Sequence, residues 1–192
     1  LHPDNSRRLA RRVADEPCRI LLFGYSPKAK GVDIAIRACQ RLIDHHVNVE
    51  LRVVSQAVSD RYFAENFPNR PEWLRVLPPT DNVSGYYNDA DIFLSASRSE
   101  GFSNSLLEAI YCGCPAVFSD IAGTRWARRF GHTFEYAVES PESLATAITT
   151  ALDRPITPDV IERNRRMAVE QYSINTWVEQ VYNTVKAFHH GK

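Results

Sequence analysis

Short apolar segments alternate along the chain with longer segments of helical periodicity, and this alternation restricts the fold more than any other feature. The segments of strand length are 19–23, 49–54, 73–77, 92–95 and 116–118, with 133–138 as a short edge strand. The predicted helices cover 32–46, 60–67, 83–88, a stretch that ends at 111, 124–130, 141–152, 158–171 and 174–189. Strands that are apolar throughout are buried on both faces, which is typical of parallel strands joined by helices. The sequence therefore predicts an α/β fold with a doubly wound, Rossmann-like parallel sheet.

A chain of 192 residues is long enough for one domain. We expect 1–17 to be a linker or entry helix, 18–152 the core, and 153–192 the closing helices. Lys and Arg together number 23, as do Asp and Glu, so the composition does not favour nucleic acid as a partner. No apolar run approaches the length that spans a bilayer, and we expect no amino-terminal leader.

The four cysteines are Cys18, Cys39, Cys112 and Cys114, and three of them lie in apolar contexts. Buried, reduced thiols in a reducing compartment are the preferred interpretation, which predicts a cytoplasmic protein. Cys112-Gly-Cys114 could be one end of a metal site, but no second Cys/His pair lies at ligand spacing.

The stretch that most favours a function is 99–109, Ser-Glu-Gly-Phe-Ser-Asn-Ser-Leu-Leu-Glu-Ala. It follows an apolar strand and opens a helix, so it presents free backbone N–H groups and the positive end of a helix dipole to an anion such as phosphate. Glu100 precedes the helix and Glu108 lies about one turn inside it, so the two carboxylates should flank this corner. Carboxylates accept hydrogen bonds from sugar hydroxyls. The combination predicts a nucleotide-sugar site.

Loops that follow parallel strands meet at one edge of the sheet, where ligands bind. The loops 24–31, 78–82, 95–104 and 119–124 all follow predicted strands. We therefore expect Lys30 to lie beside the corner formed by Glu100 and Glu108.

These residues resemble the E-x7-E signature of retaining glycosyltransferases of family 4 (group 1). The segment 100–109 is followed by Gly113-Cys-Pro115, while Lys30-Gly31 after the first strand and 87–91 before the fourth also fit. The resemblance covers about 18–152 and implies one half of a GT-B architecture, the carboxyl-terminal half that binds the donor. The combination of motifs is specific, although each alone is weak.

The resemblance implies a role for each matching residue. Glu108 would bind the ribose hydroxyls, Glu100 would contact the transferred sugar, and Lys30 would neutralise the diphosphate as charge grows on the leaving group. Glu100 and Lys30 are thus the catalytic candidates. The remaining donor-binding candidates are Gly101, Phe102, Ser103, Asn104, Ser105, Gly24 and Lys28. No metal or cofactor is expected, and the substrate would be a UDP- or GDP-linked sugar.

The chain departs from the family pattern at several positions. Tyr25 stands where the family has an arginine after the first-strand glycine, which leaves Lys28 as the alternative cation. The segment 55–57 replaces a second-strand glycine turn, and Trp126 stands where the family has glutamate. A GT-B enzyme also has an amino-terminal acceptor half that these residues do not supply. We expect the chain to be part of a longer enzyme of polysaccharide or glycoconjugate biosynthesis, with a saccharide or lipid-linked acceptor and a peripheral contact with the cytoplasmic membrane face.

Simpler interpretations stay open. Ser105 and Glu108 also fit a capping box, in which the glutamate satisfies only the helix start. Glu100 could be a surface carboxylate, Lys30 a solvated loop lysine, and Arg125 with its neighbours a solvated helix face. Two further functions use the same features: a sugar-nucleotide-binding module without catalysis, and an epimerase or phosphorylase on a related scaffold.

Overall fold

The computed structural model describes residues 16–58 and 70–173, together with residues 62, 65, 67, 175, 176, 178, 182 and 186. The strands are β1 (Cys18–Phe23), β2 (Val49–Val54), β3 (Leu74–Leu77), β4 (Ile92–Ser95), β5 (Ala116–Ser119) and β6 (Thr133–Tyr136). The helices are α2 (Val32–Asp44), α4 (Val83–Asp89), α5 (Asn104–Tyr111), η1 (Arg125–Arg129), α6 (Pro141–Asp153) and α7 (Pro158–Tyr172). In this part of the chain the strands form one parallel sheet in the order β3-β2-β1-β4-β5-β6.

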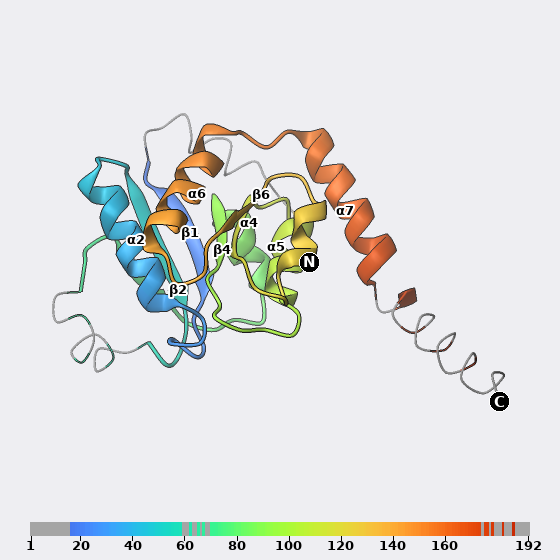
Figure 1. Ribbon diagram of the computed structural model, residues 1–192, viewed down its shortest axis with the longest axis horizontal. Helices are drawn as coiled ribbons and strands as arrows, with labels where there is room; N and C mark the ends of the chain where they lie inside the picture. Colours follow the sequence, from blue (N-terminus) through green and yellow to red (C-terminus); the bar gives the residue numbers. More distant parts are fainter. Residues whose placement is uncertain are drawn as a thin grey trace.

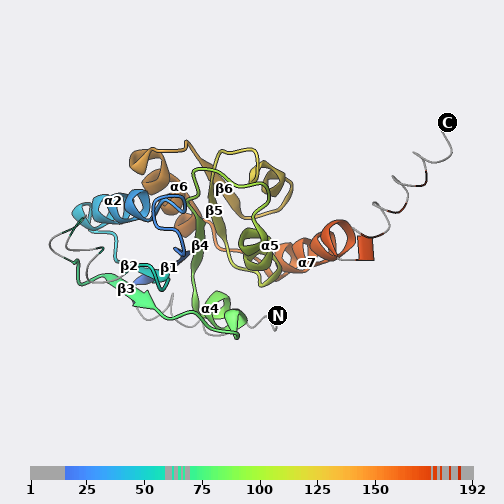
Figure 2. The same ribbon diagram turned by 90° about the horizontal axis from the view of Figure 1, so that it is seen from below.

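Helices cover both faces of the sheet, as the apolar strands require. One layer is formed by α2 and α6, and the opposite layer by α4, α5 and α7 (Figures 1 and 2). Alternate residues of β1 enter the two layers: Ile20 and Leu22 pack with α2, whereas Leu21 and Phe23 pack with α4 and α5. The predicted doubly wound fold is confirmed, because strands β1 to β5 supply apolar side chains to both cores and the edge strand β6 supplies them to the layer of α2 and α6.

The predicted element boundaries agree with the structure to within one or two residues over the described range. The helix expected at 124–130 is a short 3-10 helix, η1. The segment has little room for a longer helix, because the Thr124 hydroxyl donates to the Ser119 carbonyl at 2.6 Å just before it and β6 begins just after it. Strand β6 ends at Tyr136, since the next backbone N–H, that of Ala137, donates to Ser143 Oγ instead of a strand. The predicted segment 1–17 lies almost entirely outside the described residues, and the helices 60–67 and 174–189 mostly so.

The remaining sequence predictions about local structure are met. Ser140 caps α6 by accepting a hydrogen bond from the Ser143 N–H at 3.1 Å, and Pro141 occupies the first turn. The four cysteines are free and buried, and burial raises the pKa of Cys39 to about 12. Among the described helices, none has the length and apolar character needed to cross a bilayer.

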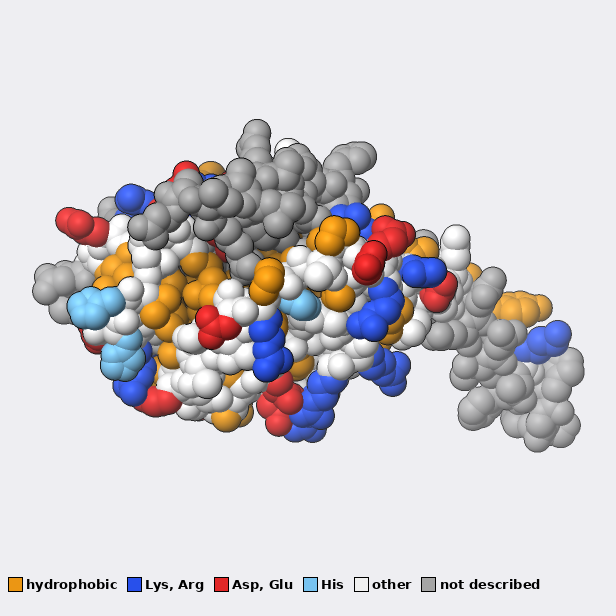
Figure 3. Space-filling model, turned by 90° about the horizontal axis from the view of Figure 1, so that it is seen from above, with side chains coloured by type: hydrophobic (Ala, Val, Ile, Leu, Met, Phe, Trp, Pro, Cys, Tyr) orange, Lys and Arg blue, Asp and Glu red, His pale blue; other side chains and the backbone are white. Residues whose placement is uncertain are grey.

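Surface charges are mixed in sign. Acidic and basic side chains alternate over the face shown in Figure 3, including the part above α7, which extends away from the sheet in Figure 1. The described residues on this face therefore form no surface of a single sign of charge.

The loop after β1 lies directly against the loop after β4, and Gly31 makes this approach feasible. Gly31 precedes α2 with a φ of +65°, a left-handed conformation that glycine adopts without strain. A Cβ atom there would lie 2.1 Å from the Ala96 carbonyl oxygen. The two loops that carry Lys30 and Glu100 are thus held in contact through a position that excludes side chains.

Gly31→Ala should lower the free energy of unfolding by about 1–3 kcal/mol or more. The alanine would have to adopt a left-handed backbone conformation, and its Cβ atom would clash with backbone atoms of Ala96. Urea denaturation followed by circular dichroism measures this loss. Gly101→Ala is the matched control, since a Cβ atom there meets nothing within 4 Å. Equal losses in the two variants would contradict the proposed close approach.

Candidate functional site

The candidate site lies where the strand order reverses. β1 and β4 are neighbours at the centre of the sheet, but β1 is connected onward to β2 on one side and β4 to β5 on the other. The chain therefore leaves β1 and β4 toward opposite sides of the sheet, and the carboxyl edge at this switch point, here called the switch-point crevice, is the usual ligand position in such sheets. Lys30 comes from the first loop, Glu100 from the second, and α5 begins just after Glu100.

Lys30 lies beside Glu100, as the topology predicted, and the two side chains form an ion pair, which the sequence did not predict. The Lys30 ammonium donates to Glu100 Oε1, and the Ser97 hydroxyl donates to the same oxygen at 2.5 Å. The Glu100 side chain is 9% exposed and that of Lys30 32% exposed. Burial opposes ionisation of Glu100, but the hydrogen bonds from Lys30, Ser97 and Ser103 and the charge of Lys30 outweigh it and lower its pKa. Glu100 is therefore a largely buried carboxylate that Lys30 keeps ionised.

Glu108 is held by a different partner, Tyr87 of α4. The Tyr87 hydroxyl lies 2.8 Å from Glu108 Oε2 and 3.1 Å from the Ser105 carbonyl oxygen. Burial and the Glu108 carboxylate raise the pKa of Tyr87, so it remains a neutral donor. The helix N-cap is Ser103 rather than Ser105, so Glu108 does not form the capping box that the sequence left open. The Tyr87 contact orients Glu108 through Oε2.

The segment between the two glutamates contains unused backbone donors. In the described structure the N–H groups of Gly101, Phe102, Asn104 and Ser105 have no protein acceptor, consistent with the first turn of a helix. The Ser103 N–H differs from them, because it donates to the Gly123 carbonyl at 3.3 Å. Four of the five predicted amides are thus available to an anion.

Gly123 allows the loop after β5 to pack closely against this segment. A Cβ atom on Gly123 would lie 2.2 Å from the Glu100 carbonyl oxygen, so the loop after β5 supports the backbone of Glu100. Ser105 lines a cavity of about 10 Å³ together with Lys30 and Glu100, which is room for roughly one water molecule. The corner is therefore compact.

Trp126, which departs from the family pattern, has a packing role. Its indole Nε1–H donates to the Gly123 carbonyl at 2.9 Å, and its ring stacks on Phe102 with centroids 4.8 Å apart. Tyr172, at the end of α7, lies 5.2 Å from Trp126 and 5.6 Å from Phe102 by ring centroid. The indole therefore braces the loop at 101–103 against α7.

The remaining predicted residues come from the loop after β1. The Gly24 N–H donates to the Val54 carbonyl at 2.9 Å, and the Gly24 carbonyl accepts a hydrogen bond from the Ser55 hydroxyl at 2.8 Å. Its backbone polar groups are therefore engaged in the fold. Lys28 is exposed, and Tyr25 is 51% exposed beside Phe23. Lys28 is thus placed on the surface near the crevice, whereas Gly24 acts through packing.

Sequence reasoning missed Arg98 and Tyr87 as members of the site. Tyr87 begins the 87–91 segment that carried the resemblance, whereas Arg98 lies two residues before Glu100 and outside the matching motifs. Their side-chain partners, Asp33 and Glu108, are far away in the sequence and become neighbours only through the sheet topology.

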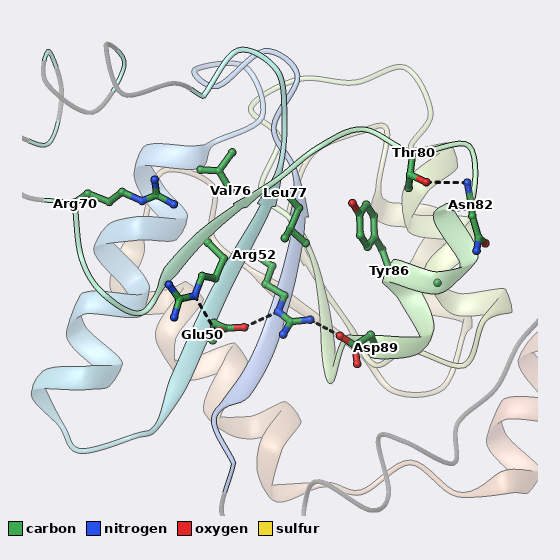
Figure 4. A pocket seen from close by; sticks show the side chains of 11 residues that line it. Glu50, Arg52, Arg70, Val76, Leu77, Thr80, Asn82, Tyr86 and Asp89 are labelled. Atoms are coloured by element: carbon green, nitrogen blue, oxygen red, sulfur yellow. Dashed lines mark hydrogen bonds and ion pairs between the residues drawn. The ribbon is translucent and has the colours of Figure 1, made fainter.

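A larger groove of about 640 Å³ lies elsewhere, between β2, β3 and α4 (Figure 4). Its central guanidinium, Arg52, is paired with Glu50 at 2.6 Å and with Asp89, as the dashed lines in Figure 4 show. Arg75 also approaches Glu50, at 3.4 Å. Because the groove lies away from the switch point of the strand order, the switch-point crevice remains the stronger candidate site.

The fold is Rossmann-like, as in the domains of GT-B glycosyltransferases. The solved structures of similar fold agree. Anabaena HepE, determined in complex with UDP and glucose, superposes with a TM-score of 0.75 at 16% identity, over 97% of this chain and 53% of that one. WaaG, a glycosyltransferase of lipopolysaccharide biosynthesis, has a TM-score of 0.68 at 25% identity, over 89% and 48%.

The sequence identifies the family more closely. Residues 17–154 match the family described as glycosyl transferases group 1, and the chain belongs to that family. D-inositol 3-phosphate glycosyltransferase of Acidothermus cellulolyticus is 28% identical over 152 residues, which cover 68% of this chain and 33% of that protein. The chain thus spans about a third of the length of this curated relative.

The stability of the fold should depend on the ionisation of Glu100. Its pKa is lowered in the folded state, so the stabilisation is complete above the ordinary glutamate pKa of about 4.3 and is lost as pH falls through the lower folded-state value. In urea denaturation from pH 6 downward (a range of about 3 units), Glu100→Gln should flatten the pH dependence of the unfolding free energy. Glu162→Gln on exposed α7 is the control, and parallel curves for Glu100→Gln and the wild type would contradict the ion pair.

Tyr87→Phe should cost about 1–2 kcal/mol of unfolding free energy, because it removes a buried hydroxyl and leaves Glu108 without that donor. Tyr86→Phe is the matched control, since the Tyr86 hydroxyl donates to the Pro78 carbonyl in an exposed setting. Thermal and chemical denaturation measure both variants. The assignment fails if the Tyr86 variant loses as much as the Tyr87 variant.

Proposed function

We propose that this chain is the donor-binding half of a retaining glycosyltransferase that moves a sugar from a nucleotide sugar to a saccharide or lipid-linked acceptor. The observation that carries the proposal is the switch-point crevice, where Lys30 is paired with Glu100 and the segment between Glu100 and Glu108 carries unused backbone N–H groups. Membership of the group 1 glycosyl transferases supports it.

The cationic side of the crevice fits a diphosphate. Lys30 is the charged donor, and we assign to the same diphosphate the N–H groups of Asn104 and Ser105 at the positive end of α5 and those of Gly101 and Phe102 just before it. As the bond between the sugar and the diphosphate breaks, negative charge grows on the leaving group, and these groups stabilise it. We propose that they act without a metal ion.

The acidic side of the crevice fits sugar hydroxyls. Glu100 is ionised and largely buried, so it is a strong acceptor for hydroxyls of the transferred sugar. Glu108 is oriented by Tyr87 about one turn inside α5, and we assign it to the ribose hydroxyls of the nucleotide. The segment 78–82 after β3 ends at the same edge and would contact the base, with a UDP- or GDP-linked donor expected.

Known proteins of this fold support the choice of donor. HepE was determined with UDP and glucose, and the pneumococcal O-GlcNAc transferase GtfA with UDP and GlcNAc. The chain covers 53% and 36% of those two chains, so we assign acceptor recognition to a further part of the enzyme. We propose that it acts in the cytoplasm, with a peripheral contact at the membrane face that supplies a lipid-linked acceptor.

A binding module without catalysis is the second candidate. It is favoured by Tyr25 and Trp126, which replace an arginine and a glutamate of the family pattern, and by the structural role of Trp126 beneath Phe102. Sugar transfer by the intact enzyme, compared with its Glu100→Gln variant, separates the two candidates.

The donor assignment is tested by titration calorimetry of the chain with UDP, GDP, ADP and their glucose conjugates. One nucleotide family should bind, and Glu108→Gln should weaken it by about tenfold, the loss of one charged hydrogen bond to the ribose. Glu162→Gln on α7 is the matched control and should bind as the wild type does. The proposal is wrong if no nucleotide binds at millimolar concentration, or if the Glu108 variant binds unchanged.

A further inference from the structure

The Arg98 guanidinium uses every N–H donor that it has. Nε and Nη2 donate to the two Glu139 oxygens, the second at 3.0 Å. Nη1 and Nη2 also donate to the two Asp33 oxygens, both at 2.9 Å, and Nη1 donates to the Lys28 carbonyl as well. A guanidinium has five N–H donors, and all five have acceptors here.

These partners lie in the segments that build the donor crevice. The Lys28 carbonyl belongs to the loop of Lys30, and the Arg98 backbone N–H donates to the neighbouring Ala29 carbonyl at 2.9 Å. Asp33 lies in the first turn of α2, directly after this loop, and Glu139 follows β6. Arg98 thus holds the backbone just before Lys30 from a position two residues before Glu100.

Arg98 does not serve as a ligand for the donor. Its own charge is opposed by the carboxylates of Asp33 and Glu139, so the cluster is net negative and would repel a diphosphate. Binding an anion there would also require it to give up a bond already made. The two carboxylates raise the pKa of Arg98. Burial would raise the pKa of Asp33, but the hydrogen bonds and charge of Arg98 outweigh burial and lower it. Arg98, Asp33 and Glu139 therefore all stay charged, and their contacts connect the loop after β4 with the loop after β1 and the segment after β6.

We propose that Arg98 is a positioning residue that sets the distance between Lys30 and Glu100. The positioning role does not depend on the proposed function. Only its consequence does, namely that the crevice is shaped to receive a diphosphate beside a sugar. Lysine cannot replace arginine here, because one ammonium cannot bond to two carboxylates in a bidentate manner and to a carbonyl at once.

The positioning itself is tested without any nucleotide. Carbon-13 NMR titration of the Glu100 carboxyl in Arg98→Lys should show its pKa rising from the depressed wild-type value, because Lys30 is no longer held against it. Arg52→Lys is the matched control: it also changes a guanidinium paired with two carboxylates, but on β2, away from the crevice. A Glu100 pKa that is unchanged in Arg98→Lys, or shifted as much in Arg52→Lys, would overturn the inference.

The consequence for binding is tested by a double-mutant cycle with the nucleoside diphosphate that binds best, using UDP first. Arg98→Lys should weaken binding by about tenfold when Lys30 is present and by much less in a Lys30→Met background. Equal weakening in both backgrounds means that Arg98 acts only through general stability, and the inference is then wrong.

The pKa titration and the binding cycle separate the positioning role of Arg98 from the proposed donor site. If the Glu100 pKa responds to Arg98→Lys but no nucleotide binds the wild type, the positioning stands and the donor assignment fails. If Arg98→Lys does not fold, Glu139→Gln replaces it in both measurements, because that variant changes only the most exposed carboxylate of the cluster, at 56% side-chain exposure. A Glu139 variant that matches the wild type in both would overturn the inference.

Discussion

The contact between the loop after β1 and the loop after β4 is the constraint on which the site depends. Parallel pairing of β1 with β4 brings the two loops to the same edge, and Gly31 lets them touch through backbone atoms. Only at this separation does the Lys30 ammonium reach the Glu100 carboxylate. The ion pair is thus a consequence of backbone packing, because flexible side chains alone would not hold a buried carboxylate in one place.

Buried charge is stable here because each ion has several partners. An unpaired carboxylate as buried as Glu100 would protonate, but Lys30 and two hydroxyl groups favour its ionised form. The Arg98 cluster follows the same rule with the guanidinium at its centre. A site with fixed charges and unused amides can stabilise charge on a leaving group without rearranging, which is the main requirement for such catalysis.

Much of the fold and part of the site could be predicted from the sequence. Apolar runs such as 19–23 specify strands buried on both faces, and Ser140 with Pro141 specifies the start of a helix, since both are local effects. The spacing of Glu100 and Glu108 likewise placed one glutamate before α5 and the other inside it. The 3-10 geometry of 125–129 and the early end of β6 escaped prediction, because contacts of Thr124 and Ser143 with other segments decide them.

The sequence by itself determined the class of fold, the order of elements and the residue types at the carboxyl edge, because periodicity and composition act over short distances along the chain. The tertiary structure alone decided which partner each charged group meets. Glu108 faces Tyr87 instead of capping its own helix, the Ser103 amide is taken by Gly123, and Arg98 joins three segments. Such pairings arise between segments that the sheet brings together from distant parts of the chain, so no local pattern encodes them.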